Sequence, residues 1–173
     1  MSTALTSEQT DLRDAVADLM SKRSSETEVR RLMATDIGYD PAVWSELAAM
    51  GLLGLIIPEE FGGSGACAAD LAVVADQFGR ALLCAPYLST AVLPPNLLLA
   101  LDDSAECTEV LPKIAAGELI ATVAFAQPGS ARPPQHPTTT AIPTPDGWRL
   151  TGTTTYVLDA GSAHRFYVLA QTH

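Results

Sequence analysis

The residues best able to do chemistry lie in one short run, Pro58 to Gly65, where two acidic side chains precede three glycines. Glu59 and Glu60 could in principle exchange protons with a substrate. Acid–base catalysis, however, requires positioned groups with tuned pKa values, which adjacency alone does not provide. The glycines permit backbone angles and close approaches that residues with a Cβ resist. We therefore interpret the run as a structural turn joining two helices, with the glutamates at its surface.

The histidines and one glycine–serine pair give only weak indications of a site. His136, His164 and His173 have no carboxylate or cysteine at the spacing of metal ligands. Gly129-Ser130 is a weak sign of a nucleophile, because no Gly-x-Ser-x-Gly elbow surrounds it. The sequence also contains no phosphate loop and no dinucleotide fingerprint. We expect no metal site.

The three cysteines, Cys67, Cys84 and Cys107, are widely spaced within apolar stretches. An odd number at wide spacing does not suit a disulfide framework or a zinc site. Free cysteine is among the residue types most often buried in proteins. The sequence therefore predicts reduced thiols in the core.

Charge and composition exclude several classes of partner. The 173 residues include 20 acidic and 10 basic side chains, for a net charge of −10, whereas nucleic-acid binding needs clustered Lys and Arg. No apolar run approaches the roughly 20 residues that span a bilayer. We therefore expect neither nucleic acid nor a membrane as a partner. Residues 1–8 lack the basic and apolar regions of a secretory signal, which predicts a cytoplasmic protein.

The elements that must position these residues are helical in the first two thirds of the chain. A capping-box spacing joins Thr6 to Gln9, and Asp40 precedes a proline, as at a helix start. The continuously apolar run 52–57 is expected to cross the core in an extended or irregular path. Pro94-Pro95 marks either the start of a helix or a bend within it. Apolar periodicity predicts helices at residues 7–23, 41–50, 66–83, 88–101 and 109–116, the last capped by Thr108 and Gly117.

After Gly117 the sequence becomes β-prone. Strands are predicted at residues 120–125, 148–151, 154–157 and 165–170. Helices first and strands second indicate a segregated α+β fold. We expect a mainly α N-terminal helical domain, residues 1–117, followed by an incomplete antiparallel β domain, residues 118–173, that is part of a barrel-like middle domain.

The stretch from Trp44 to Gly65, which includes Leu-Gly-Leu-Ile-Ile-Pro-Glu-Glu-Phe-Gly-Gly-Ser-Gly, resembles the N-terminal signature of the acyl-CoA dehydrogenase family. Three further pieces follow in the family's order: Phe78-Gly79-Arg80 with Pro86, Leu111 to Glu118, and Asp146 to Gly152. The resemblance implies a helical domain, a β domain and a second helical domain, with FAD held between the last two and helped by a neighbouring subunit. In that family a glutamate of the final helical domain removes the α proton while the flavin accepts the β hydride. That glutamate has no counterpart in this chain.

The resemblance assigns the first flavin contacts to a segment that usually reads aromatic-x-x-Thr-Glu-Pro, followed by Gly-Ser-Asp. Here the segment runs from Val123 to Ser130. Ala126 takes the place of the threonine and Gln127 that of the acid, with Phe125 beside them as a further cofactor position. Ser130 takes a position implied to contact the substrate.

The second flavin segment usually reads Gly-x-Lys-x-Trp-Ile-Ser/Thr-Asn and corresponds here to Gly152 through Asp159. Tyr156 replaces the tryptophan and could still stack on a flavin. Leu158 replaces the hydroxyl residue and cannot donate a side-chain hydrogen bond. The resemblance thus implies FAD as cofactor, not necessarily held by this chain alone.

The implied partners are acyl-CoA and a related dehydrogenase subunit, in a homo- or hetero-oligomer. The eroded flavin positions resemble the non-catalytic member of heteromeric acyl-CoA dehydrogenases from steroid-degrading actinobacteria. Two functions follow from the resemblance. One is a part or subunit of a flavin-dependent acyl-CoA dehydrogenase that is not catalytic alone. The other is a non-catalytic acyl-CoA-binding or scaffolding partner of a complete subunit. A third reading, that the sequence is a truncation of a longer product, stays open.

Overall fold

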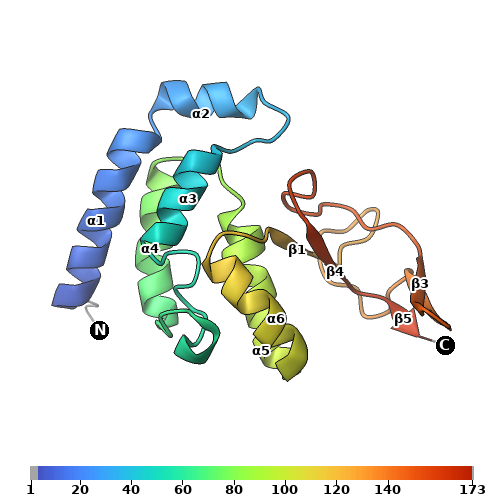
Figure 1. Ribbon diagram of the computed structural model, residues 1–173. Coiled ribbons are helices and arrows are strands. Elements are labelled where there is room, and N and C mark those ends of the chain that lie inside the picture. Colours follow the sequence, from blue (N-terminus) through green and yellow to red (C-terminus); the bar gives the residue numbers. More distant parts are fainter. Residues whose placement is uncertain (1–3, 173) are drawn as a thin grey trace.

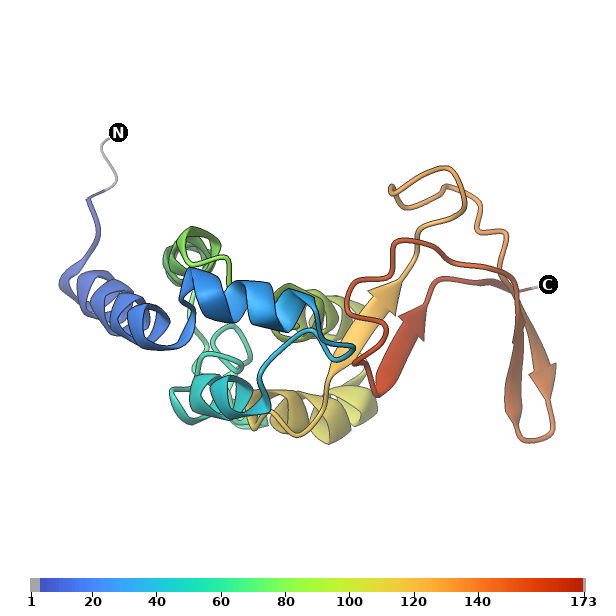
Figure 2. The same ribbon diagram turned by 90° about the horizontal axis from the view of Figure 1, so that it is seen from above.

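The helices and the strands occupy opposite ends of the molecule. The computed structural model describes residues 4–172 and places α1 at one end and the hairpin of β2 and β3 at the other (Figures 1 and 2). This segregation confirms the expected order of a helical domain followed by the start of a β domain. His173 lies outside the described residues.

The first helix begins where the capping-box spacing predicts. In α1 (Ser7–Arg23) the Thr6 hydroxyl accepts from the Gln9 amide, and the Gln9 side chain accepts from the Thr6 amide, both at 3.2 Å. Val16 and Met20 bury the inner face of the helix. Gln9 also donates to Asp70 at 2.9 Å, which joins the start of α1 to the start of α4 (Ala68–Arg80).

A short helix that the sequence reading missed follows α1. In α2 (Glu26–Met33) five of eight residues are polar or charged, so that the apolar periodicity is too sparse to detect. Ser25 caps its N-terminus, and Val29 and Leu32 are the residues that it buries. The inner face thus consists of two side chains spaced three residues apart. So small a face stabilises the helix only because the other helices provide a surface on which it packs.

The remaining helices confirm most of the predicted boundaries and correct one. Asp40 caps α3 (Pro41–Ala49) as expected. A π-helical turn (Leu88–Val92) leads directly into α5 (Leu93–Leu101), so the two prolines lie in the first turn of the α-helix. In contrast, α6 (Ser104–Ala115) begins five residues before the predicted start, and Asp103 caps it. Thr108 lies inside the helix and donates back to the Ser104 carbonyl at 2.7 Å.

Residues 52–57 follow an irregular path through the interior, as the sequence predicts. Leu52, Leu53 and Leu55 belong to one buried cluster, and Ile57 belongs to a second one beneath α5 and α6. A non-helical backbone inside a core must still satisfy its polar groups. The glycine loop, residues 58–65, supplies the partners: the amides of Ser64 and Gly65 donate to the carbonyls of Gly54 and Ile57 at 3.0 and 2.8 Å.

Within residues 4–172, five strands follow the helices, and their pairing is mixed. The antiparallel pair is β2 (Thr140–Thr144) with β3 (Gly147–Thr151), whereas β1 (Ala121–Ala124) runs parallel to β4 (Arg165–Val168), and β2 runs parallel to β5 (Gln171–Thr172). The antiparallel pairing expected of the β domain thus occurs between β2 and β3, and the two parallel pairs are additional to it. Long connections bring sequence-distant strands side by side, and periodicity carries no information on their direction.

The strand expected at 154–157 does not form. Tyr156 has φ +51°, outside the extended region, and the segment turns towards the helical domain. Conversely, β2 and β5 were not expected, because β2 contains Pro143 and β5 has two residues. β2 lies between β3 and β5, but β5 pairs only with Thr140 and Ala141, so one side of Pro143 faces no paired strand and its missing amide can point there.

The cysteines differ in their surroundings. All three are free thiols; Cys107 is buried, Cys84 is half-buried, and Cys67 is exposed at the start of α4. Burial raises the pKa of the Cys107 and Cys84 thiols above the ordinary value. The expectation of core thiols is thus right for Cys107 and wrong for Cys67, whose apolar neighbours in sequence are the residues of a helix N-terminus.

A polar cluster joins the first strands to the last helix of the helical domain. Arg165 on β4 donates to Glu106 at 2.8 Å and to Glu109 at 2.9 Å on α6, and the Tyr167 hydroxyl donates to Glu106 at 2.7 Å. The hydrogen bond from Arg165 lowers the pKa of Glu109 below its ordinary value. The parallel sheet of β1 and β4 is therefore attached to α6 by charge as well as by the buried Ala121.

The glycine loop yields a stability prediction. A Cβ on Gly63 would lie 2.0 Å from the Ile57 carbonyl oxygen, so that Gly63→Ala forces the packed backbone apart. We expect a loss of about 3 kcal/mol in the free energy of unfolding, measured by urea denaturation. The control is Gly79→Ala on α4, where a Cβ meets nothing within 4 Å and helix propensity improves. Equal stability of the two variants would contradict the packed loop.

The Arg165 cluster yields a pH prediction. Because the pKa of Glu109 is lowered from 4.5 in the folded state, its contribution to stability is present above pH 4.5 and is lost as the pH falls through the lowered value. Arg165→Met should lower the melting temperature at neutral pH. The melting temperature of this variant should then fall less than that of the unaltered protein as the pH is lowered below 4.5. The matched variant Arg149→Met removes an exposed charge from β3. If Arg149→Met flattens the acid response equally, general charge and not the Arg165 cluster is responsible.

Candidate functional site

The two segments expected to face a flavin lie against each other. The Thr155 amide donates to the Ala126 carbonyl at 2.9 Å, and the Thr122 hydroxyl donates to the Leu158 carbonyl at 2.8 Å. Residues 122–126 and 155–158 are therefore neighbours although about thirty positions separate them in sequence. The tertiary structure brings together the two segments that the resemblance singled out.

The side chains at the end of β1 point in different directions. Ala126 is 3% exposed, and its carbonyl is engaged by Thr155. Phe125 instead lines a mostly apolar cavity of about 410 Å³ with Leu97 and Leu101 of α5 and with Leu169 beyond β4. Successive residues of an extended chain face opposite sides, which separates Phe125 from Ala126.

Gln127 and Ser130 form a tight bend after β1. The Ser130 amide donates to the Gln127 carbonyl at 3.0 Å, and the Gln127 side-chain amide donates to the His136 carbonyl at 3.3 Å. The exposed Ser130 hydroxyl accepts from the Arg132 amide at 3.2 Å. The bend thus holds Ser130 at the surface and ties Gln127 to the proline-rich loop.

The second segment exposes its apolar residues. Tyr156 is 70% exposed and Leu158 is 46% exposed. Positive φ angles at Tyr156 and Asp159, +51° and +49°, turn the chain so that these side chains face outwards. An exposed aromatic ring beside an exposed leucine is a surface available to a flat ligand or to another chain.

By themselves these residues do not fit a flavin ring. Phe125, Ala126 and Leu158 have no polar side-chain atom, and the Gln127 amide already donates to a carbonyl. Tyr156 provides a ring for stacking but lies on the exposed turn. Hydrogen bonds to a bound flavin would therefore have to come from the backbone or from another chain.

Thr155 is one residue that the sequence reading did not single out. Its hydroxyl oxygen is buried next to the Ala126 backbone and has no hydrogen-bond partner among the described residues. Buried polar groups nearly always have a partner. The only sequence signal is a threonine repeated at positions 153–155, which does not reveal which hydroxyl faces inwards.

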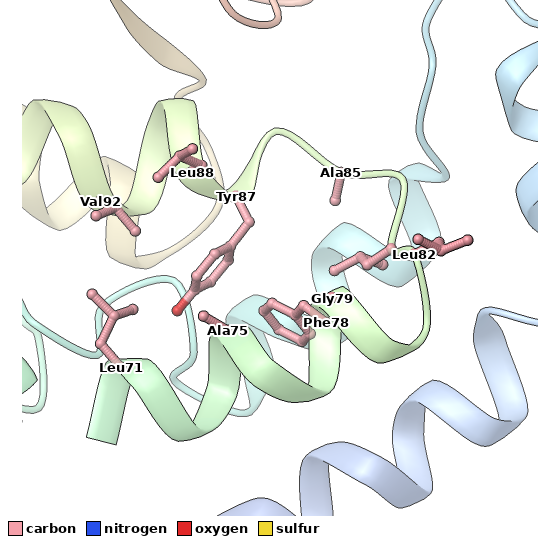
Figure 3. Close-up of a pocket in the computed structure, with 10 residues that line it drawn as sticks. Leu71, Ala75, Phe78, Gly79, Leu82, Ala85, Tyr87, Leu88 and Val92 are labelled. Carbon is pink, nitrogen blue, oxygen red and sulfur yellow. The ribbon is translucent and has the colours of Figure 1, made fainter. Parts of the chain in front are cut away.

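A second apolar cavity lies within the helical domain between α4 and the π-helical turn (Figure 3). It has a volume of about 370 Å³. From α4 come Leu71, Ala75 and Phe78, while Leu88 and Val92 approach from the π-helical turn, as Figure 3 shows. The sequence reading placed the α4 residues on an apolar helix face without distinguishing packed positions from those lining a cavity.

Tyr87 reaches into this cavity without offering it a free hydroxyl. The ring packs edge-on against Phe78 with centroids 4.7 Å apart, and the hydroxyl donates to the Leu52 carbonyl at 3.0 Å. Burial raises the pKa of Tyr87 above its ordinary value. The cavity is thus lined almost wholly by apolar groups and suits an apolar ligand.

His136 and His164, the histidines among the described residues, have different hydrogen-bond partners. The imidazole Nδ1 of His164 accepts from the Ile120 amide at 3.1 Å, while the His136 carbonyl meets Gln127. Within residues 4–172 no group of three His, Cys, Asp or Glu side chains is arranged as metal ligands would be. Over the same residues, no helix combines the length and the apolar character that crossing a bilayer requires.

The helices of the described part of the chain, the glycine loop and the adjoining strands define the class of protein. Residues 6–118 match the family model described as the acyl-CoA dehydrogenase N-terminal domain. The match covers more than half of the chain, and the chain belongs to this family.

Two curated proteins of this family are similar to the chain in sequence. The acyl-CoA dehydrogenase IpdE2 of Mycolicibacterium smegmatis is 43% identical over 115 residues, which are 66% of this chain and 35% of that protein. The IpdE2 of Mycobacterium tuberculosis is 40% identical over 111 residues, 63% of this chain and 35% of the relative. The chain thus spans about a third of the length of these curated relatives.

Solved structures share the fold over nearly the whole chain. The ChsE4-ChsE5 complex from Mycobacterium tuberculosis superposes with a TM-score of 0.85 at 27% identity, covering 99% of this chain and 46% of the other. A variant of the Tcur3481-Tcur3483 steroid ACAD gives a TM-score of 0.83 at 30% identity, with 95% and 45% coverage. The shared part is therefore the helical domain together with the start of the β domain.

The buried hydroxyl of Thr155 yields a prediction. Thr155→Val removes a polar atom that has no partner, so we expect the free energy of unfolding to stay the same or to rise by about 1 kcal/mol. Thr122→Val is the control, because the fully buried Thr122 hydroxyl donates to Leu158, and we expect a loss of about 1 kcal/mol there. Urea denaturation of both variants measures these changes in the free energy of unfolding. Destabilisation by Thr155→Val as large as that by Thr122→Val would show that the Thr155 hydroxyl is bonded.

Proposed function

We propose that this chain is part of a subunit of a flavin-dependent acyl-CoA dehydrogenase, which introduces an α,β double bond into an acyl-CoA thioester. The observation that carries the proposal is the family match over residues 6–118. The chain contributes the helical domain and the start of the β domain and does not catalyse the reaction alone. In the family, the resemblance places the glutamate that removes the α proton in the final helical domain.

The cavity between α4 and the π-helical turn supports acyl-CoA as the ligand. Its lining is mostly apolar, and it opens to the surface at Leu88, which is 53% exposed, so it favours an apolar group. An acyl chain loses no hydrogen bonds on entering such a space. The helical domain would then hold the acyl end, while the thioester lies towards the β domain.

We propose that FAD is shared with another chain. Phe125, Ala126, Gln127, Tyr156 and Leu158 form the two segments that would face it, and Ser130 would face the substrate. Support for FAD comes from an acyl-CoA dehydrogenase of this fold from Bacillus anthracis, 24% identical, whose structure is complexed with FAD. Most of these positions lack a free polar side-chain group, which supports a cofactor bound mainly by a partner chain.

A hetero-oligomer is the assembly that we propose. The ChsE4-ChsE5 complex, which shares this fold, joins two subunits. The steroid ACADs and IpdE2 among the relatives favour degradation of steroid or fatty acyl-CoA as the setting. Exposed Tyr156 and Leu158 provide apolar surface for a neighbouring chain.

We place the domain boundary at Gly117, giving residues 1–117 and 118–173. Gly117 has φ +75° directly after α6, and β1 begins at Ala121. We also propose a cytoplasmic location. Three free thiols are typical of proteins from a reducing compartment.

A second candidate is a non-catalytic acyl-CoA-binding or scaffolding partner of a complete dehydrogenase subunit. Alanine at 126 and leucine at 158, where the family has hydroxyl side chains, favour it. The two candidates differ in one measurable property. A dehydrogenase subunit enables flavin-dependent acyl-CoA oxidation when combined with its partner, whereas a scaffold leaves the partner's own rate unchanged.

The acyl-CoA proposal predicts the effect of filling the cavity. Ala75→Trp places a large ring in the space between α4 and the π-helical turn, and we expect the affinity for decanoyl-CoA to fall about tenfold or more. Calorimetric titration measures it, with free CoA as the ligand that lacks the acyl chain. Ala72→Trp, an equal change at an exposed position of the same helix outside this cavity, should leave affinity unchanged. Absence of decanoyl-CoA binding to the unaltered protein would refute the proposal.

A further inference from the structure

The π-helical turn, Leu88–Val92, makes different contacts on its two faces. Leu88 and Val92 line the apolar cavity on one face (Figure 3). Ser89 and Thr90, both fully buried, bond to the β domain on the other. Single π-helical turns are rare and mark places where a helix departs from its regular hydrogen bonding. A single short element thus contacts both the proposed ligand site and the neighbouring domain.

Ser89 makes the closer of the two links to the proposed flavin-facing residues. Its hydroxyl lies 2.6 Å from a carboxylate oxygen of Asp159 and 3.1 Å from the Pro86 carbonyl. A hydroxyl has one proton to donate, and a carboxylate is the stronger acceptor. Asp159 ends the turn that exposes Tyr156 and Leu158.

The turn is strained and needs to be held. Tyr156 and Asp159 both have left-handed backbone angles, which residues other than glycine adopt at a cost in free energy. Such conformations persist only where surrounding contacts determine them. The contacts here include the Ser89–Asp159 hydrogen bond, the bond from Thr122 to the Leu158 carbonyl, and the bond from the Ser162 amide to the Asp159 carbonyl at 3.0 Å.

We propose that Ser89 is a positioning residue that couples occupancy of the apolar cavity to the conformation of the Tyr156–Asp159 turn. The proposal rests on the proposed function, because it assigns an acyl chain to the cavity and a flavin-facing role to the turn. A ligand packed against Leu88 and Val92 holds the π-helical turn in place, and Ser89 then holds Asp159. The turn becomes ordered for the cofactor when the acyl chain is bound.

Thr90 provides the contrast. Its hydroxyl donates at 3.0 Å to the carbonyl of Ala121, a residue within the parallel pair of β1 and β4. That link joins the π-helical turn to a regular strand and bypasses the turn at 156–159. Thr90→Val therefore removes an equally buried hydrogen bond of the same element without cutting the proposed connection.

The first test needs no ligand. Hydrogen exchange of the Tyr156–Asp159 amides is measured by mass spectrometry in the full protein. Ser89→Ala should speed exchange about tenfold, as expected on loss of a hydrogen bond to a carboxylate. Asp159→Ala, at an exposed position, should do the same and add nothing in the double variant. Thr90→Val should leave exchange of this turn unchanged, and Asp159→Asn, which keeps an acceptor oxygen, should restore slow exchange.

The second test fills the cavity from the opposite wall. Ala75→Trp on α4 should slow exchange of the turn about threefold or more when Ser89 is present, and not at all in the Ser89→Ala or Asp159→Ala background. Decanoyl-CoA should act as Ala75→Trp does, and free CoA should not. A turn that responds equally with and without Ser89, or that does not respond to Ala75→Trp, overturns the coupling. Failure of decanoyl-CoA to bind overturns the proposed function instead, while the Ala75→Trp comparison still decides the coupling.

Discussion

The helical domain depends on one constraint, the need to satisfy the backbone of an irregular segment that crosses its interior. Residues 52–57 connect two buried clusters, one around α1, α3 and α4 and one beneath α5 and α6. Without helix or strand, their carbonyls need partners from elsewhere. The glycine loop provides them at a distance that leaves no room for a Cβ on Gly63. The side chains of Glu59 and Glu60 in the same loop are exposed. The loop is therefore a means of joining two cores, and its chemistry is that of the peptide group.

The junction between the helical and β parts also depends on hydrogen bonds between groups that are distant in the sequence. Arg165 and Tyr167 reach α6, and Thr90 and Ser89 reach β1 and the turn after β3. Most of these links are side chains bonded to a charged group or to backbone. Such bonds depend on geometry more strongly than apolar contact does. They hold the first strands in a defined place although β1 and β4 form only a two-stranded sheet.

The two segments at the β end are joined through the backbone, since the Thr155 amide donates to the Ala126 carbonyl. Backbone hydrogen bonds preserve a fold regardless of the side chains, whereas cofactor contacts depend on them. The contact between the two segments therefore requires no particular side chain at position 126.

Sequence alone determined the helices with strong periodicity or clear caps, the irregular run 52–57, the change from helix to strand near Gly117, and the family. These depend on local patterns, which the chain carries wherever it folds. It did not reveal α2, the parallel pairing of β1 with β4, or the absence of a strand at 154–157. Each of these depends on contacts between distant residues, such as Ser89 with Asp159. The candidate site divides in the same way. The resemblance singled out two segments that we propose face a flavin. Only the tertiary structure decided that Ala126 is buried, that Tyr156 is exposed, and that a cavity lies against α4, because exposure is a property of packing and not of sequence spacing.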